Sequence, residues 1–84
     1  ITLGGEQLSI ARMRVETLSG LFRERIDTLT DQEGITVLLH KRGNALTVPP
    51  RPETLLRPGD EIVLLATWEK LRMLSLRNRA SRDI

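Results

Sequence analysis

The chain has 84 residues, 13 of them basic and 11 acidic, which gives a formal net charge of +2 and room for one small domain. A domain of this size buries only about 60–65% of the surface that its unfolded chain exposes, so a partner subunit would help to stabilise it. The absence of Cys excludes disulfides and thiolate metal sites. With only two aromatic residues, Phe22 and Trp68, the sequence is not typical of a base-stacking nucleic-acid reader.

The sequence contains no apolar run of the ~20 residues needed to span a bilayer, and it does not open with a signal-peptide pattern. It begins with Ile1 rather than Met, and we therefore expect it to be a piece of a longer protein. Residues 1–9 are mostly small and polar, which predicts a linker or leading segment, and residues 79–84 predict a flexible basic tail. The predicted domain spans residues 10–78.

Residues 10–18 predict the first strand of this domain. Apolar Met13 and Val15 alternate there with charged neighbours, and a period of two is typical of a half-exposed strand. A helix is the alternative, because some of the apolar residues also fit wider spacings. The pattern ends at Ser19 and Gly20, and Ser19 is placed to cap a following helix.

A helix is predicted next, over about residues 21–32. Its evidence is an apolar stripe at helical spacing, which we expect to face the core: Phe22, Ile26 and Leu29. Gly34 follows the stripe and can adopt the left-handed conformation that commonly ends a helix.

The middle of the chain predicts a hairpin. Residues 35–39 are continuously apolar and rich in β-branched side chains, as in a buried strand. Residues 40–42, His-Lys-Arg, indicate that this strand emerges into water, and the pair 43–44, Gly-Asn, predicts a turn into a return strand over 45–48. Prolines end the return strand because they cannot donate to a ladder: Pro49, Pro50 and Pro52.

The last elements are a buried strand and a helix. Residues 57–60, Arg-Pro-Gly-Asp, carry the proline and glycine of a type II turn. Residues 61–66 form the most apolar strand, and Thr67 is expected to cap a helix over 68–78. The element order predicts a small α+β domain, β-α-β-β-β-α, with two helices on a mainly antiparallel or mixed sheet.

Few residues are candidates for catalysis or metal binding. His40 is the only histidine and has no partner at a metal-ligand spacing, so we favour a polar residue at a strand end. The serines lack the context of a nucleophile. Asp60 and Glu61 follow a turn, where carboxylates usually accept local hydrogen bonds. We therefore expect neither an enzyme nor a metal site.

The rim of the predicted hairpin is the candidate ligand-binding site. Its members are Lys41, Arg42, Pro49, Pro50 and Arg51. The basic side chains among them could contact a small anionic ligand, although a solvated surface is the alternative explanation. A small basic nucleic-acid-binding module is a more distant alternative for the whole chain, to be tested by salt-sensitive binding.

Several short sequence features follow one another in a characteristic order along residues 34–74. A strand ends in the basic turn 41–43, a return strand closes on Val48-Pro49, and a Pro-x-Thr-x-Leu segment at 52–56 precedes Gly59-Asp60 and an apolar strand. In this order and spacing the chain resembles the TrkA-C domain (RCK-C), the C-terminal lobe of regulator-of-K⁺-conductance proteins. The resemblance extends over roughly residues 12–76.

The resemblance implies a non-catalytic, ligand-sensing domain on the cytoplasmic side of the cell membrane. Such a domain is part of, or bound to, an integral membrane potassium channel or transporter, or alternatively a cation/proton antiporter or sodium/anion symporter. The family implies a homodimer in which ligand binding, often at the dimer interface, biases a gate in the membrane part. No nucleic acid partner is expected.

Some members of this family bind cyclic di-AMP in the dimer cleft, through an apolar pair followed by Asp, Arg and Asn. When the sequences are aligned on Gly34, these polar positions are Thr28, Thr30 and Thr36 here, and Glu24-Arg25 replaces the apolar pair. The resemblance therefore does not imply a cyclic dinucleotide bound in that way. NAD and nucleotide binding in these proteins belongs mainly to the N-terminal lobe, which this sequence lacks.

Overall fold

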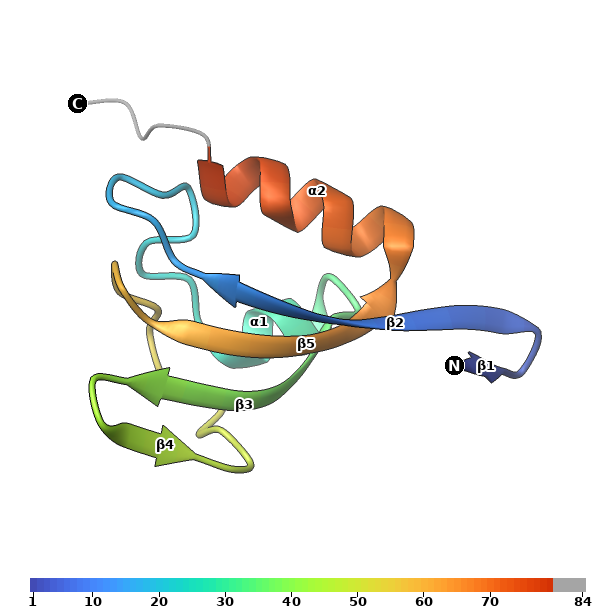
Figure 1. Cartoon of the computed structure of the whole chain (residues 1–84), viewed down its shortest axis with the longest axis horizontal. Coiled ribbons are helices and arrows are strands. Elements are labelled where there is room, and N and C mark those ends of the chain that lie inside the picture. The colour runs from blue at the N-terminus through green and yellow to red at the C-terminus, as the bar shows by residue number, and fades with distance from the viewer. Residues whose placement is uncertain (80–84) are drawn as a thin grey trace.

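A computed structural model describes residues 1–79, which form a five-stranded antiparallel sheet with two helices (Figure 1). In chain order the elements are β1 (Thr2–Leu3), β2 (Glu6–Arg14), α1 (Ile26–Asp31), β3 (Thr36–Arg42), β4 (Ala45–Thr47), β5 (Glu61–Thr67) and α2 (Trp68–Arg79). The strand order in the sheet is β1-β2-β5-β3-β4, which places the last strand of the chain at the centre. The predicted α+β class is confirmed, and β1 is an additional strand.

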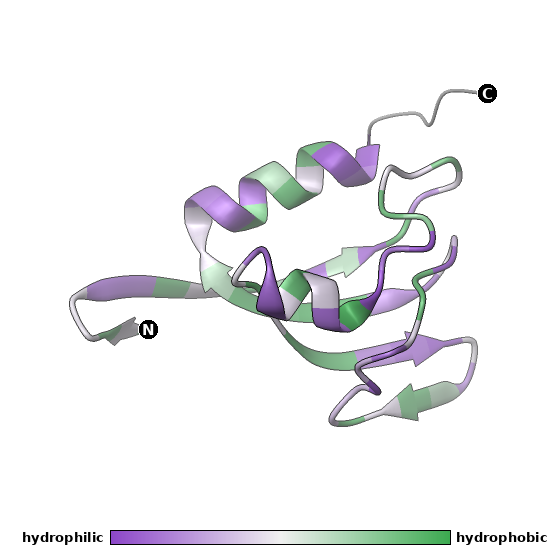
Figure 2. Ribbon diagram, turned by 180° about the vertical axis from the view of Figure 1, so that it is seen from behind, coloured by the Kyte–Doolittle hydropathy of each residue, from purple (hydrophilic) through white to green (hydrophobic). Residues whose placement is uncertain are grey.

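Both helices pack on one face of the sheet. Alternate residues of β5 are buried on that face because side chains of a strand point to opposite sides in turn: Ile62, Leu64 and Ala66. They form a single hydrophobic cluster with side chains of both helices: Ile26, Leu29, Leu71 and Leu74. Figure 2 views the molecule from this side, with α1 in front of the strands. The opposite face of the sheet carries no helix of the described residues.

The first long strand begins earlier and ends earlier than predicted. β2 starts at Glu6, and it pairs with β5 from Leu8 opposite Thr67 to Arg14 opposite Glu61. Residues 1–9, expected to be a linker or leading segment, contribute β1 and the first part of β2. The first half of this strand has no alternation of apolar and polar residues that would predict it, because neither of its faces is buried.

The first helix is shorter than predicted, since α1 begins at Ile26 rather than near residue 21. The residues before it pair their backbone with the segment that precedes β5. The N–H of Arg23 donates to the carbonyl of Leu56 at 2.9 Å, and the N–H of Leu56 donates to the carbonyl of Glu24 at 2.9 Å. Arg23 also has a φ of 65°, a left-handed conformation that a right-handed helix excludes.

Ser19 caps a turn instead of a helix. Its Oγ accepts a hydrogen bond from the N–H of Leu21 at 2.9 Å and donates to Oδ1 of Asn78 at 2.7 Å. Leu21 is fully buried, whereas Phe22, expected in the core, is only half-buried. The apolar stripe of the predicted helix is therefore confirmed for Ile26 and Leu29 but not for Phe22.

The second half of the chain agrees closely with the prediction. Gly59 has a φ of 89°, and the N–H of Asp60 donates to the carbonyl of Arg57 at 3.0 Å, as a type II turn requires. Thr67 caps α2, because its Oγ1 accepts a hydrogen bond from the N–H of Lys70 at 3.4 Å.

The final helix extends to the last residue that the structure describes. Arg79 ends α2, and the rest of the predicted tail lies outside the described residues. Leu71 and Leu74 are buried, but Trp68 is 67% exposed and does not belong to the core. Within residues 1–79, neither helix has the length and apolar character needed to cross a bilayer.

Candidate functional site

A surface hollow of about 410 Å³ lies between α1, the start of β3 and the proline-rich loop that follows β4. We call it the α1–β3 hollow. Two of the predicted site residues, Pro49 and Pro50, line it. Ile26 of α1 and Val37 of β3 add apolar surface, and the threonine at position 36 adds a hydroxyl group. The mixture of apolar wall and a few polar groups is typical of a small-molecule site.

Local backbone geometry brings the walls of the hollow together. Gly34 has a φ of 68° and turns the chain from α1 into β3, so that Thr30 and Thr36 line the same hollow. The proline-rich loop is fixed to the start of α1, because the N–H of Asp27 donates to the carbonyl of Pro52 at 2.8 Å.

The charged groups that line the α1–β3 hollow are acidic, Asp27 and Asp31. Arg25 donates to Asp27 from Nε at 2.9 Å and from Nη2 at 2.7 Å. These hydrogen bonds are the main reason that the pKa of Asp27 lies below its ordinary value of 3.8. Asp31 has no ion pair among the described residues. A single copy of the hollow therefore does not attract an anion.

The three basic residues of the predicted site do not line the hollow. Arg42 donates from Nε to Oδ1 of Asp60 at 2.9 Å and from Nη2 to Oδ2 at 2.8 Å. Lys41 and Arg51 are exposed and make no ion pair within residues 1–79. A ligand-binding role for these residues stays a prediction.

His40 does not emerge into water, contrary to the sequence prediction. It is only 6% exposed, and its Nε2 lies 2.9 Å from Oδ2 of Asp60. Asp60 is also buried and accepts a further hydrogen bond from the N–H of Arg57 at 3.0 Å. Burial raises the pKa of Asp60, but the hydrogen bonds from Arg42, His40 and Arg57 outweigh it and lower this pKa below 3.8. The cluster joins β3 to the turn before β5.

The sequence identified some of the lining residues and missed others. Of the three polar positions that the family resemblance points to, Thr30 and Thr36 line the hollow and Thr28 does not. Asp27 and Asp31 carried no signal, because a carboxylate on a helix is usually a solvated surface group. In the described part of the chain, no group of three or more His, Asp or Glu residues is placed to hold a metal ion. The arrangement is suited to non-covalent binding.

The TrkA-C domain family matches residues 10–77. The RCK_C domain dimer of S. agalactiae BusR in complex with c-di-AMP has a similar fold, with a TM-score of 0.70 and 17% identity, over 83% of this chain and 95% of that one. The RCK C domain of the potassium transport protein KtrA, also with c-di-AMP, gives 0.63 and 24%, over 83% and 84%. The GsuK RCK domain gives 0.61 and 19%, over 84% of this chain and 16% of that one.

The same fold occurs in a protein bound to DNA. S. agalactiae BusR in complex with its busAB promoter DNA has a TM-score of 0.69 and 18% identity, over 83% of this chain and 35% of that one. The expectation that a protein of this kind has no nucleic acid partner is therefore not supported. No curated protein matches the chain. With the family covering most of its length and its fold shared with these RCK_C domains, the chain belongs to the TrkA-C domain family.

Proposed function

We propose that this chain is a non-catalytic regulatory domain that pairs with a second copy and binds a small molecule in the α1–β3 hollow. The observation that carries the proposal is the position of Thr30 and Thr36, which line one hollow together with Pro49 and Pro50. These two threonines occupy the positions that the family resemblance assigns to ligand-binding Arg and Asn. The hollow is therefore the counterpart of the ligand site, with different side chains.

The side chains of the hollow favour a neutral or cationic ring compound. Its ring would pack against Ile26 and Val37, and its hydrogen-bond donors would face the carboxylates of Asp27 and Asp31. The phosphates of cyclic di-AMP would meet these carboxylates and find no arginine at position 30. The prediction of a small anionic ligand from the sequence relied on basic residues that lie outside the hollow.

A second copy would cover apolar surface beside the hollow. β4 is an edge strand, and Leu46 within it and Val48 just after it are 60% and 63% exposed. The chain then continues into Pro49 and Pro50, which line the hollow. A dimer contact here would bury apolar side chains next to the ligand, so that pairing and ligand binding would reinforce each other. BusR shows that an RCK_C domain can form a dimer with a bound nucleotide.

A melting experiment tests the ligand site. A ligand at 100 times its Kd raises the free energy of unfolding by about 2.7 kcal/mol, which a thermal melt detects easily. We expect adenosine or thiamine, as neutral and cationic ring compounds, to raise Tm more than ATP or cyclic di-AMP does. Thr30→Trp fills the hollow and should abolish the shift, whereas Thr17→Trp, at an exposed threonine outside it, should retain it. An equal shift in both variants would contradict binding in the hollow.

We infer that the parent protein is a potassium channel or transporter, with this domain on the cytoplasmic side of the membrane. The support is that the potassium transport protein KtrA and the GsuK channel contain domains of this fold. A cation/proton antiporter or a sodium/anion symporter is the alternative parent.

Complementation of bacterial transport mutants distinguishes a potassium channel or transporter from a cation/proton antiporter as the parent protein. The full-length protein, with residues 10–77 present or deleted, is expressed in a strain that lacks potassium uptake and in a strain that lacks sodium/proton antiporters. Growth at low potassium that changes when the domain is deleted supports the potassium parent. Restored sodium tolerance alone would contradict it.

A further inference from the structure

A second groove, of about 390 Å³, runs between α2 and the strand β2. We call it the α2–β2 groove. Four residues of α2 recur at helical spacing and line it: Trp68, Arg72, Leu76 and Arg79. Its other wall comes from Ala11, Arg12 and Met13 of β2. The hollow and this groove share no lining residue.

A stretch of backbone at this wall of the groove has no strand partner. β5 pairs with one edge of β2, and β1 pairs with the other edge only at Glu6 and Gln7 (Figure 1). The N–H of Leu8 donates to the carbonyl of Ile1. At the C-terminal end of β2, the side chain of Asn78 donates to the carbonyl of Arg14. Between these points, no strand of the described residues pairs with this edge over 9–13. An open edge of this kind can accept an added strand.

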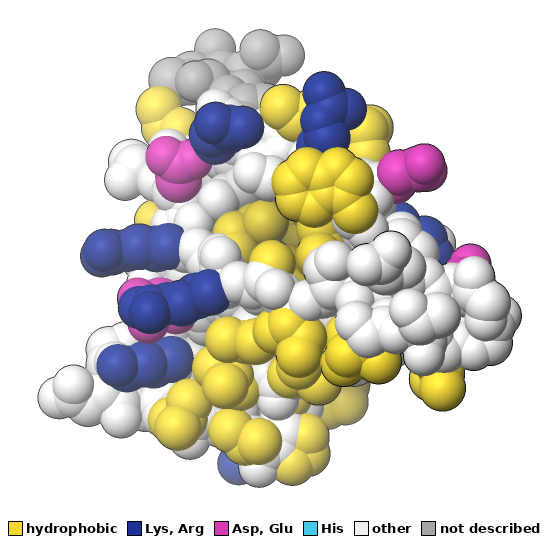
Figure 3. Space-filling view, turned by 45° about the vertical axis from the view of Figure 1, so that its right-hand side comes forward, with side chains coloured by type: hydrophobic (Ala, Val, Ile, Leu, Met, Phe, Trp, Pro, Cys, Tyr) yellow, Lys and Arg dark blue, Asp and Glu magenta, His cyan; other side chains and the backbone are white. Residues whose placement is uncertain are grey.

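The groove combines positive charge with exposed apolar surface. Arg12, Arg72 and Arg79 line it, and none of the described residues that line it is acidic. Arg12 is already paired with Glu61 at 3.2 Å, so the free positive charge comes from α2. Arg72 and Arg79 make no ion pair within residues 1–79. Trp68 is 67% exposed, which is unusual for a large apolar side chain. Figure 3 shows hydrophobic side chains next to Lys and Arg side chains in the upper part of the molecule, where α2 lies.

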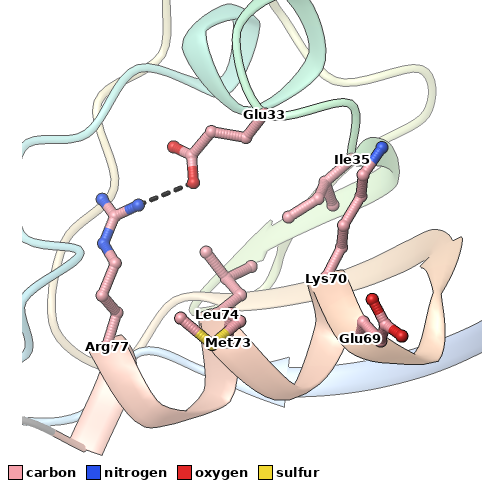
Figure 4. A pocket seen from close by; sticks show the side chains of 7 residues that line it. All are labelled: Glu33, Ile35, Glu69, Lys70, Met73, Leu74 and Arg77. Carbon is pink, nitrogen blue, oxygen red and sulfur yellow. Dashed lines mark hydrogen bonds and ion pairs between the residues drawn. The ribbon is translucent and has the colours of Figure 1, made fainter.

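A third hollow, of about 310 Å³, lies on the other side of α2 and differs in charge (Figure 4). Arg77 crosses it to donate to Glu33 at 2.7 Å, and it also donates to Glu24 at 2.9 Å. Glu69 and Lys70 add one charge of each sign to its lining. Because its arginine is already neutralised, this hollow offers no comparable attraction for an acidic partner.

We propose that the α2–β2 groove binds an extended segment of a partner protein that is rich in acidic and apolar residues. The backbone of this segment pairs with the open edge of β2, which adds a strand to the sheet. Its acidic side chains contact Arg72 and Arg79, and its apolar side chains pack against Trp68 and Leu76. A second copy of this chain is a poorer occupant, because pairing of β2 with β2 would bring the arginines of both copies together. This binding goes beyond the proposed ligand sensing and uses a different surface.

Fluorescence polarisation with short labelled peptides tests the proposal on the whole chain. A peptide that alternates Glu with Val should bind saturably, and a peptide that alternates Lys with Val should not. The double variant Arg72→Glu/Arg79→Glu should weaken binding of the Glu/Val peptide roughly tenfold or more. The matched control, Arg23→Glu/Arg57→Glu, makes the same charge change at exposed residues outside the groove and should bind as the wild type does.

Two further measurements separate strand addition from charge attraction alone. A Glu/Val peptide with proline at its centre should bind much more weakly, because proline cannot donate to the ladder. Amide hydrogen exchange over residues 9–13 should slow when the Glu/Val peptide binds. Equal binding of the proline peptide, or an equal loss in both double variants, would overturn the proposal. Tighter binding of a DNA duplex than of the Glu/Val peptide, lost in Arg72→Glu/Arg79→Glu, would overturn it in favour of a nucleic acid partner.

Discussion

The Nε2 atom of His40 lies 2.9 Å from the Oδ2 atom of Asp60, and both side chains are buried. The same carboxyl group accepts two hydrogen bonds from Arg42 and one from the N–H of Arg57. One buried carboxylate therefore joins β3 to the turn that starts β5, the central strand of the sheet. A residue at the edge of a turn thus has a larger structural role than its place in the sequence suggests.

Removing this negative charge should destabilise the domain. Asp60→Asn leaves Arg42 and His40 without their anionic partner, and we expect the free energy of unfolding to fall by about 2–3 kcal/mol. The value lies below that for a fully buried pair, because the Arg42 side chain is 37% exposed. Urea denaturation measures it. The control, Glu61→Gln, breaks an exposed pair with Arg12 and should cost about 1 kcal/mol or less. Equal costs for the two variants would contradict the role of the cluster.

The same cluster predicts a dependence of stability on pH. The pKa of Asp60 lies below its ordinary value of 3.8 in the folded state, so the unfolded chain takes up a proton first as the pH falls. The stabilisation is complete above about pH 5 and is lost as the pH falls through 3.8 toward the folded-state pKa. The free energy of unfolding, measured by urea denaturation over this pH range, should change less with pH in Asp60→Asn than in the wild type. A residual dependence on pH should come from Asp27, whose pKa is also lowered. A slope in Asp60→Asn equal to that of the wild type would contradict this role of the Asp60 carboxyl group.

Asn78 should be one of the most sensitive polar positions. Its Nδ2 donates to the carbonyl of Arg14 at 2.7 Å, and its Oδ1 accepts from Ser19 Oγ at 2.7 Å and from the N–H of Glu16 at 3.1 Å. Asn78→Ala leaves these groups without a partner at the end of α2, and we expect a loss of about 2–3 kcal/mol by urea denaturation. Asn44→Ala, in the exposed β3–β4 turn, should change stability by about 0.5 kcal/mol or less. A loss at position 78 no larger than this would show that water replaces the amide.

The strained backbone at Arg23 predicts a substitution that does not destabilise the domain, unlike those at Asp60 and Asn78. Its φ is 65°, where a side chain costs about 1–2 kcal/mol and glycine costs nothing extra. Arg23→Gly should therefore raise Tm or leave it unchanged, although glycine also frees the unfolded chain. Arg51→Gly, at an exposed residue with negative φ, should lower Tm. A lower Tm for Arg23→Gly than for Arg51→Gly would mean that the Arg23 side chain itself stabilises the fold.

Cyclic di-AMP provides a gain-of-function prediction for the α1–β3 hollow. The wild-type chain should give no saturable binding by calorimetry, because Thr28, Thr30 and Thr36 replace the Asp, Arg and Asn implied by the family resemblance. Substitution of all three, Thr28→Asp/Thr30→Arg/Thr36→Asn, should introduce measurable binding. Tight binding to the wild type would contradict the ligand chemistry proposed for the hollow.

Local backbone signals explain why most of the fold could be predicted from the sequence. Gly43 and Gly59 both have positive φ, at turns that the sequence places correctly. The strands 35–39 and 61–66 were found because continuous apolar, β-branched runs favour strands, although burial alternates along β5 and is incomplete in β3. These signals depend on residues that are close in the chain, and a single sequence contains all of them.

Contacts between distant residues explain the errors. The helix predicted from residue 21 fails because Arg23 pairs its backbone with Leu56, a partner that helical periodicity cannot reveal. His40 was assigned to the surface because its partner, Asp60, lies 20 residues further along the chain, where a local pattern cannot reveal it. In the candidate site, Pro49 and Pro50 could be predicted from an exposed loop, whereas Asp27 and Asp31 became visible only when the loop and α1 came together.

One NMR titration tests the central claim, that the chain is a dimerising, ligand-binding domain with its site in the α1–β3 hollow. Amide spectra of the whole chain are recorded with increasing adenosine or thiamine, and relaxation of the same sample reports the tumbling time. We predict shifts concentrated at Thr30, Thr36 and Val37, together with tumbling that corresponds to twice the 9.5 kDa mass of one chain. Tumbling of a 9.5 kDa monomer at every concentration, with no shift at these amides, would contradict the account.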